Sequence, residues 1–163
     1  MKIGLDIGCG DNIIENSNDC DFYIGIDNLG FYDKKLSIDE KIIDWKKCVS
    51  YNKYYSDQIE KFKGKFIIAD ANNLPFKDNS FIKINSTCFI GRFETKNTIN
   101  EVYRVLKNNE KFEIYNSYVL VDFFNKLIFD LLKNFEKIDL EIQNFDKREN
   151  YMDIIIKTTK KEK

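Results

Sequence analysis

Three acidic residues and a pair of glycines are the residues whose types and spacing could do chemistry. Asp6, Asp27 and Asp70 stand at or near the ends of short apolar runs, and Gly8 and Gly10 follow the first run. Glycines let the main chain bend and let a ligand approach it closely, while carboxylates accept hydrogen bonds from hydroxyl and amino groups. One such acid would suggest a helix cap or a surface residue. Three at successive strand ends indicate a nucleotide-like ligand site.

The elements that must position these residues follow from the hydrophobic pattern. In chain order, strands are predicted over 2–7, 22–27, 65–69, 81–86, 113–116, 137–142 and 152–158. Helices are predicted over 12–18, 37–49, 54–62, 98–106 and 119–135. Strands that alternate with helices and end in a hairpin predict an α/β fold, a doubly wound, mostly parallel seven-stranded sheet with a C-terminal antiparallel hairpin.

Length and composition restrict the class of protein. The 163 residues predict a single domain over 1–159 with a flexible tail at 160–163. Lys and Arg number 26 against 27 for Asp and Glu, so the net charge of −1 gives no support to binding of nucleic acid or membrane. The four cysteines lie far apart and the chain has no histidine, so we expect free thiols and no metal site. With neither a signal peptide nor a long apolar run, the expected location is the cytoplasm.

A nicotinamide or flavin dinucleotide fits the glycine turn less well. That family of sites needs a third glycine, which would fall at Ile13, so that helix and strand can pack closely. The segment 28–64 leaves a different choice open, because it is rich in Tyr and Lys. An amphipathic helix pair with a solvated lysine face is favoured there over a nucleic-acid surface.

Four segments in order resemble one family, the class I S-adenosylmethionine-dependent methyltransferases, of the small type-11-like kind. The similar segments are Leu5–Gly10, Tyr23–Asp27, Asp70–Phe81 and Glu101–Lys107. They extend over most of the chain. The resemblance implies S-adenosylmethionine as cofactor and an unidentified methyl acceptor as substrate.

The resemblance also implies roles for individual residues. Asp27 would accept from the ribose hydroxyls, and Asp70 from the adenine amino group beside the amide of Ala71. Leu29 and Leu74 would sandwich the adenine, and the turn after the first strand would receive the methionine part. The implied cofactor-binding residues are Asp6, Gly8, Cys9, Gly10, Asp27, Asn28, Leu29, Asp70, Ala71 and Asn85.

The segment after the fourth strand departs from the family pattern. An acid often found at Ile82 and a Glu-His pair at Gly91 and Arg92 are both missing, and no general base is evident. Alignment of the acceptor with the methyl group can supply about 7–11 kcal/mol of the barrier without a base. The candidates to orient the acceptor are Asn85, Tyr32 and Glu94.

Many relatives have helices before the first strand, and we expect this domain to lack these N-terminal helices and to have an open cleft. A large substrate, the segment 28–64, a second copy of the chain or a partner subunit would then cover the cleft. The function predicted is methyl transfer by in-line displacement. The alternatives are a catalytically inactive binding or assembly module and an RNA-directed methyltransferase that uses Lys53, Tyr54, Tyr55 and Lys61.

Overall fold

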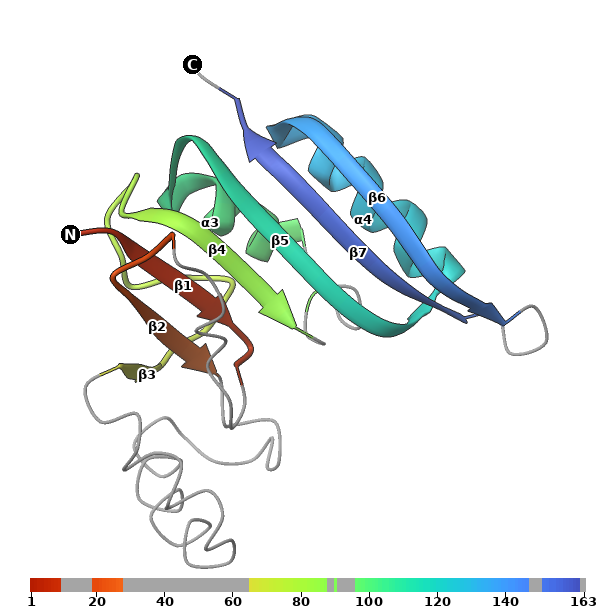
Figure 1. The fold of residues 1–163 in the computed structure, drawn as a ribbon, viewed down its shortest axis with the longest axis horizontal. Coiled ribbons are helices and arrows are strands. Elements are labelled where there is room, and N and C mark those ends of the chain that lie inside the picture. Colours follow the sequence, from red (N-terminus) through yellow and green to blue (C-terminus); the bar gives the residue numbers. More distant parts are fainter. Residues whose placement is uncertain (10–18, 28–64, 88–89, 91–95, 147–150, 162–163) are drawn as a thin grey trace, which may run out of the picture.

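The structure, a computed structural model, describes residues 1–9, 19–27, 65–87, 90, 96–146 and 151–161. The strands are β1 Ile3–Ile7, β2 Phe22–Asp27, β3 Phe66–Ile68, β4 Phe81–Thr87, β5 Leu106–Leu120, β6 Phe135–Asp146 and β7 Tyr151–Lys160. The described helices are α3 Lys96–Val105 and α4 Val121–Asn134. All seven strands form one sheet (Figure 1). The predicted helices 12–18, 37–49 and 54–62 lie outside the described residues.

The strand order is β3-β2-β1-β4-β5-β7-β6. The first five strands in this order pair in parallel, and β7 pairs antiparallel with both β5 and β6. The predicted class of fold, a mostly parallel α/β sheet that ends in an antiparallel hairpin, is therefore confirmed. The chain passes from β1 to β2 and β3 on one side and then to β4 and β5 on the other. Neither described helix combines the length and the apolar character needed to cross a membrane.

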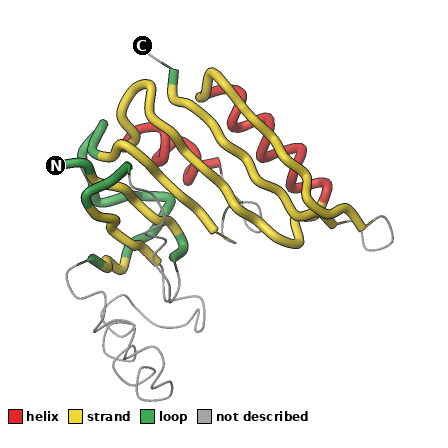
Figure 2. The backbone as a smooth tube through the Cα atoms, viewed as in Figure 1, coloured by secondary structure: helices red, strands yellow, loops and turns green. Residues whose placement is uncertain are grey.

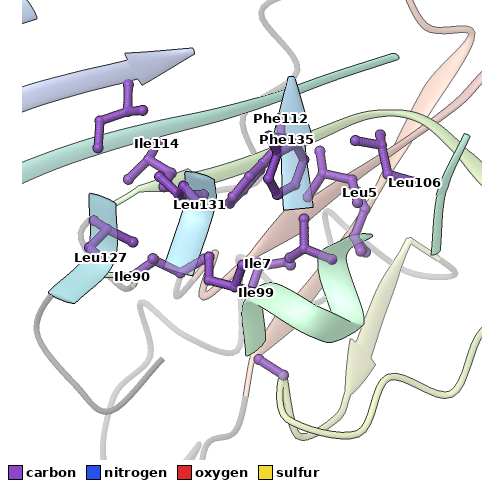
Figure 3. Packing of buried hydrophobic residues seen from close by; sticks show 14 of the residues in the cluster. Leu5, Ile7, Ile90, Ile99, Leu106, Phe112, Ile114, Leu127, Leu131 and Phe135 are labelled. Atoms are coloured by element: carbon purple, nitrogen blue, oxygen red, sulfur yellow. The ribbon is translucent and has the colours of Figure 1, made fainter. Parts of the chain in front are cut away.

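One face of the sheet, here called the apolar face, carries the main core. Leu5 pairs with Ile84 and Ile84 with Phe112, and all three side chains are fully buried. Both described helices pack on this face, and Figure 3 shows Ile99 and Leu131 beside the strand residues of the core. The alternation of apolar and polar residues in each strand directs this set to one side.

The opposite face, here called the polar face, carries a different cross-strand row. Asp6 pairs with Asn85, Asn85 with Glu113, and Glu113 with Lys157. These residues sit on the pleats between the apolar ones, so they lie on the other side of the sheet. The polar face is thus charged across the middle strands, where a sheet covered by apolar helix faces would carry apolar side chains.

The last three strands are longer than the sequence predicts (Figure 2). Strand β5 begins at Leu106, directly after α3, although the sequence predicts a strand only over 113–116. The chain makes a local irregularity there, because the pairing with β4 jumps from Phe81 to Lys83 and Asn109 has a φ of 63°. Asn tolerates this left-handed conformation better than most residues. The apolar pattern did not predict these strand ends because they contain polar residues, which are common where one side of the hairpin faces solvent.

Lys160 is part of β7 and does not belong to the flexible tail predicted over 160–163. Only 4% of the residue is exposed. Its ammonium donates to the Leu106 carbonyl at 2.5 Å and to Asn79 Oδ1 at 2.9 Å, and it lies 4.6 Å from the ring centre of Tyr103. Apolar patterning could not reveal this position, because a charged residue becomes buried only where such partners meet it.

Candidate functional site

The candidate site lies at the carboxyl ends of the parallel strands, beside the point where the strand order reverses. Strands β1 and β4 are neighbours there, and the chain continues from β1 to β2 toward one edge of the sheet and from β4 to β5 toward the other (Figure 1). Open parallel sheets bind ligands in the crevice at such a point.

The three acids predicted from the sequence follow the edge of the sheet in steps. Asp6 pairs with Gly25, which places Asp27 two residues further along the strand direction. Asp27 pairs with Ile68, so Asp70 comes two residues further again. Each step corresponds to about 7 Å along the strands. The acids are therefore spread over adjacent strand ends, an arrangement suited to an extended ligand and unlike the compact cluster that holds a metal ion.

The turn after β1 is fixed to β2 through its main chain. The amides of Gly8 and Cys9 both donate to the Ile26 carbonyl, at 2.9 Å and 3.2 Å. Gly8 has a φ of 68°, a conformation that glycine adopts without steric cost. Gly8 can therefore allow a ligand to approach its main chain closely, while the amides of Gly8 and Cys9 hold the turn. Gly10 lies outside the described residues.

Asp6 and Asn85 lie side by side at this edge, on β1 and β4. Asp6 is fully buried and Asn85 is 3% exposed. The oxygens Asn85 Oδ1 and Thr87 Oγ1 are buried and accept no hydrogen bond from the described part of the chain. A buried polar atom left in this state costs about 1–3 kcal/mol. The cost is offset if a ligand donates to these oxygens.

Asp27 and Asp70 occupy different environments. Asp27 ends β2, where it is half-buried and its carbonyl accepts from the Ala69 amide at 3.2 Å. Asp70 is exposed, and its Oδ1 accepts from the amide of Asn72 at 2.8 Å and from its side chain at 3.1 Å. Asp70 thus shapes the turn that it begins. Ala71, the next residue, is 6% exposed. Asn28 and Leu29, which follow Asp27, lie outside the described residues.

The sequence did not reveal how the loop after β3 (70–78) is held. Arg104 on α3 donates to the carbonyls of Leu74 and Phe76, at 2.9 Å and 2.7 Å, and to Asp78 Oδ1 at 2.8 Å. Glu101 accepts from Arg104 Nε at 2.8 Å and from the Leu74 amide at 2.7 Å. The bond from Arg104 lowers the pKa of Glu101, and the bonds to Glu101 and Asp78 raise the pKa of Arg104. The pair therefore stays charged and clamps the loop. The spacing of Glu101 and Arg104 on one helix side was the available signal.

A second cluster missed by the sequence lies on the polar face. Glu113 Oε2 accepts from the Tyr115 hydroxyl at 2.8 Å and lies 3.2 Å from Lys83 Nζ. Burial raises the pKa of Glu113, but Tyr115 and Lys83 outweigh it and the net shift is downward. Burial and then the bond to Glu113 raise the pKa of Tyr115 to about 12. Both groups thus keep their ordinary charge states at neutral pH, which favours a structural pair over a proton-transfer pair.

Of the three candidates to orient a methyl acceptor, the structure describes only Asn85. Tyr32 and Glu94 lie outside the described residues. Past the end of β4, the Ile90 amide donates to Ser86 Oγ at 3.4 Å, and Asn116 Nδ2 donates to the Ile90 carbonyl. The described residues at the end of β4, Asn85–Thr87, are uncharged. They can orient an acceptor by hydrogen bonds and cannot act there as a general base.

Comparisons with known proteins support the class of fold. The family described as "Methyltransferase domain" matches residues 39–114. No curated protein sequence matches the chain.

Three solved structures share the fold over almost the whole chain. The YcgJ protein from Bacillus subtilis is 15% identical, with 99% of this chain and 93% of that one covered and a TM-score of 0.63. A SAM-dependent methyltransferase from Methanosarcina mazei is 16% identical, with coverages of 99% and 93% and a TM-score of 0.62. The N-methyltransferase NodS from Bradyrhizobium japonicum, bound to S-adenosyl-L-homocysteine, is 11% identical, with coverages of 99% and 79% and a TM-score of 0.66. The predicted resemblance to methyltransferases is therefore confirmed at the level of the fold.

Proposed function

We propose that this chain, which has the fold of the class I S-adenosylmethionine-dependent methyltransferases, binds S-adenosylmethionine and transfers its methyl group to an acceptor not yet identified. We also propose that the protein acts in the cytoplasm. Methyl transfer is its function, and binding of the cofactor is the first requirement for that transfer.

One observation carries the proposal. Asp27 ends β2, Gly8 directly follows β1 and Asn85 lies on β4, so these residues stand at one edge, on either side of the reversal in strand order. The buried oxygens Asn85 Oδ1 and Thr87 Oγ1 lie at the same edge and accept no hydrogen bond from the described residues. Donor groups of a ligand would supply the hydrogen bonds that these oxygens lack. An acidic residue at the end of β2 is suited to accept hydrogen bonds from a ribose diol.

The residues present fit the cofactor along the edge. Asp27 would accept from the ribose hydroxyls, each bond to its carboxylate contributing about 1.5–3 kcal/mol. Asp70 and the Ala71 amide would face the adenine ring. Asp6 and Asn85 would bind the methionine end, where the Gly8 main chain permits a close approach. The stepped order of the acids matches the order base, ribose and amino acid.

When bound, S-adenosylmethionine supplies a methyl group on a sulfonium, which is an excellent leaving group. The chain's own contribution is to hold the acceptor in line with that methyl group, and such alignment can account for about 7–11 kcal/mol of the barrier. Because Asn85–Thr87 are uncharged, this edge suits an acceptor that arrives as a neutral amine or a thiolate. Asn85 would orient the acceptor by a hydrogen bond.

Calorimetric titration with S-adenosylmethionine and S-adenosylhomocysteine tests the proposal directly. We expect both to bind, and binding to be lost or greatly weakened in Asp27→Ala. Incubation with S-adenosylmethionine and candidate amines or thiols should then yield S-adenosylhomocysteine. Failure of both compounds to bind at about millimolar concentration would contradict the proposal, since a methyl donor must occupy the site.

A second candidate is a catalytically inactive module that binds a partner. The lack of a titratable side chain among the described residues at the end of β4 favours it. Cofactor binding without S-adenosylhomocysteine production, over a broad set of acceptors, would support it. An RNA-directed enzyme is a weaker candidate, because the net charge is −1 and Lys53, Tyr54, Tyr55 and Lys61 lie outside the described residues.

A further inference from the structure

The loop after β3 is bonded to one side of α3 at successive points. Thr98 Oγ1 donates to Asn72 Oδ1 at 2.9 Å. Three residues further along the helix, Glu101 accepts from the Leu74 amide at 2.7 Å. Three residues further again, Arg104 donates to the Leu74 carbonyl at 2.9 Å. Residues at this spacing share one side of a helix, so Thr98, Glu101 and Arg104 form a continuous edge, here called the α3 edge.

Burial and hydrogen bonds hold the α3 edge rigid. Thr98 is 1% exposed. The guanidinium of Arg104 directs all three of its nitrogens to acceptors on Glu101, on Asp78 and on the loop carbonyls. A planar donor group used in this way fixes both the distance and the orientation of the chain that it binds.

Asp70 lies between β3 and this edge, which holds the far side of its turn. Its side chain bonds only to Asn72 among the described residues, and its carbonyl accepts from the Asn73 amide at 3.0 Å. These contacts all lie within the turn, so they shape it without attaching it to the rest of the fold. On its strand side the turn is attached to β2, where the Ala69 amide donates to the Asp27 carbonyl at 3.2 Å. On its far side the attachment comes through Asn72 to Thr98 and through Leu74 to Glu101 and Arg104.

We infer that the α3 edge sets the preference of the site for adenine, by holding Asp70 and Ala71 where they can tell an amino group from a carbonyl. The inference rests on the proposed function, which places the base at this loop. Thr98, Glu101 and Arg104 are positioning residues, since they act through the loop and do not touch the ligand. Discrimination by hydrogen bonds requires groups held to within about 0.5 Å, which an unattached surface turn does not provide.

The test compares S-adenosylhomocysteine with S-inosylhomocysteine, in which a carbonyl oxygen replaces the adenine amino group. Calorimetry gives both affinities for the full chain and for Thr98→Val and Arg104→Lys. The wild-type chain should prefer S-adenosylhomocysteine by about tenfold or more, because the carbonyl oxygen meets the Asp70 carboxylate. In both variants the preference should fall to about threefold or less. Glu136→Gln, an exposed change on β6, should keep the wild-type ratio.

The ratio separates positioning from general stability, because a loosened fold weakens both ligands alike. If the wild-type chain binds neither compound, the proposed function fails and the inference fails with it. If it binds S-adenosylhomocysteine but either shows no preference or keeps its full preference in both variants, the inference alone is overturned. Thr98→Val is nearly isosteric and removes a single donor, so it decides the question even if Arg104→Lys does not fold.

Discussion

The ring of Tyr23 lies directly against Gly4, its partner across β1 and β2. A Cβ on Gly4 would overlap that ring, which is 1% exposed and has little room to move. We expect Gly4→Ala to lower the free energy of unfolding by about 1–3 kcal/mol, the usual effect of overpacking. In a Tyr23→Ala background the same change should cost much less, and chemical denaturation of the four proteins measures the difference. Additive effects would contradict this packing.

Asp27 should be essential for cofactor affinity. Asp27→Asn keeps the shape of the side chain and removes its charge, so each bond to a ribose hydroxyl becomes weaker. We expect S-adenosylhomocysteine to bind about 10- to 100-fold more weakly, measured by calorimetry. Asp139→Asn, on an exposed part of β6, is the control and should bind as the wild type does. If Asp27→Asn and the wild type bind S-adenosylhomocysteine with equal affinity, the ribose does not bind at the end of β2.

Replacing Thr87 should change the stability of the fold and the affinity for the cofactor in opposite directions. Its hydroxyl is buried and makes no hydrogen bond to the described residues, so Thr87→Val should raise the unliganded free energy of unfolding, by up to about 1 kcal/mol. The same change should lower the affinity of the protein for S-adenosylhomocysteine. Thr158→Val is a matched contrast, because the Thr158 hydroxyl donates to the Phe112 carbonyl at 3.2 Å and its loss should destabilise the fold. Thermal unfolding with and without ligand measures both effects. Unchanged binding would place Thr87 outside the site.

Glu101 should contribute to the acid sensitivity of the fold. Its hydrogen bond from Arg104 is the main cause that holds its pKa below the ordinary value of 4.5. A carboxyl with a lowered folded-state pKa stabilises the fold above its unfolded pKa, and this contribution disappears as the pH falls through the folded value. Between about pH 5 and pH 3, Glu101→Gln should therefore lose less stability than the wild type. Denaturant unfolding at both pH values tests this, with Glu136→Gln expected to follow the wild type.

Tyr115 should be one of the last tyrosines to lose its proton. Burial and the bond to Glu113 raise its pKa to about 12. Glu113→Gln removes the charge and should shift this titration toward the ordinary value of 10.0 without reaching it, because burial remains. Absorbance titration measures the change, and loss of the transition in Tyr115→Phe assigns it. A late transition that persists in Tyr115→Phe would belong to another residue.

Several features of the fold were accessible from the sequence because they depend on local pattern. The predicted bounds lie within two residues of the observed ones for five elements, β1, β2, β4, α3 and α4. Each shows a clear alternation or helical spacing of apolar residues. The hairpin strands were underestimated because half of their residues face solvent, and polar ends look like turns. The same limitation hid the strand character of 107–110.

The sequence by itself determined the type of sheet and the candidate acids Asp6, Asp27 and Asp70, because an acid after an apolar run is a local signal and parallel strands share one carboxyl edge. Only the tertiary structure decided how these acids are held. Asn72 and Leu74 meet Thr98, Glu101 and Arg104 across 26 to 30 residues of chain. Such contacts depend on how β3, its loop and α3 pack together, and no periodicity within any one of those segments encodes the partner in another.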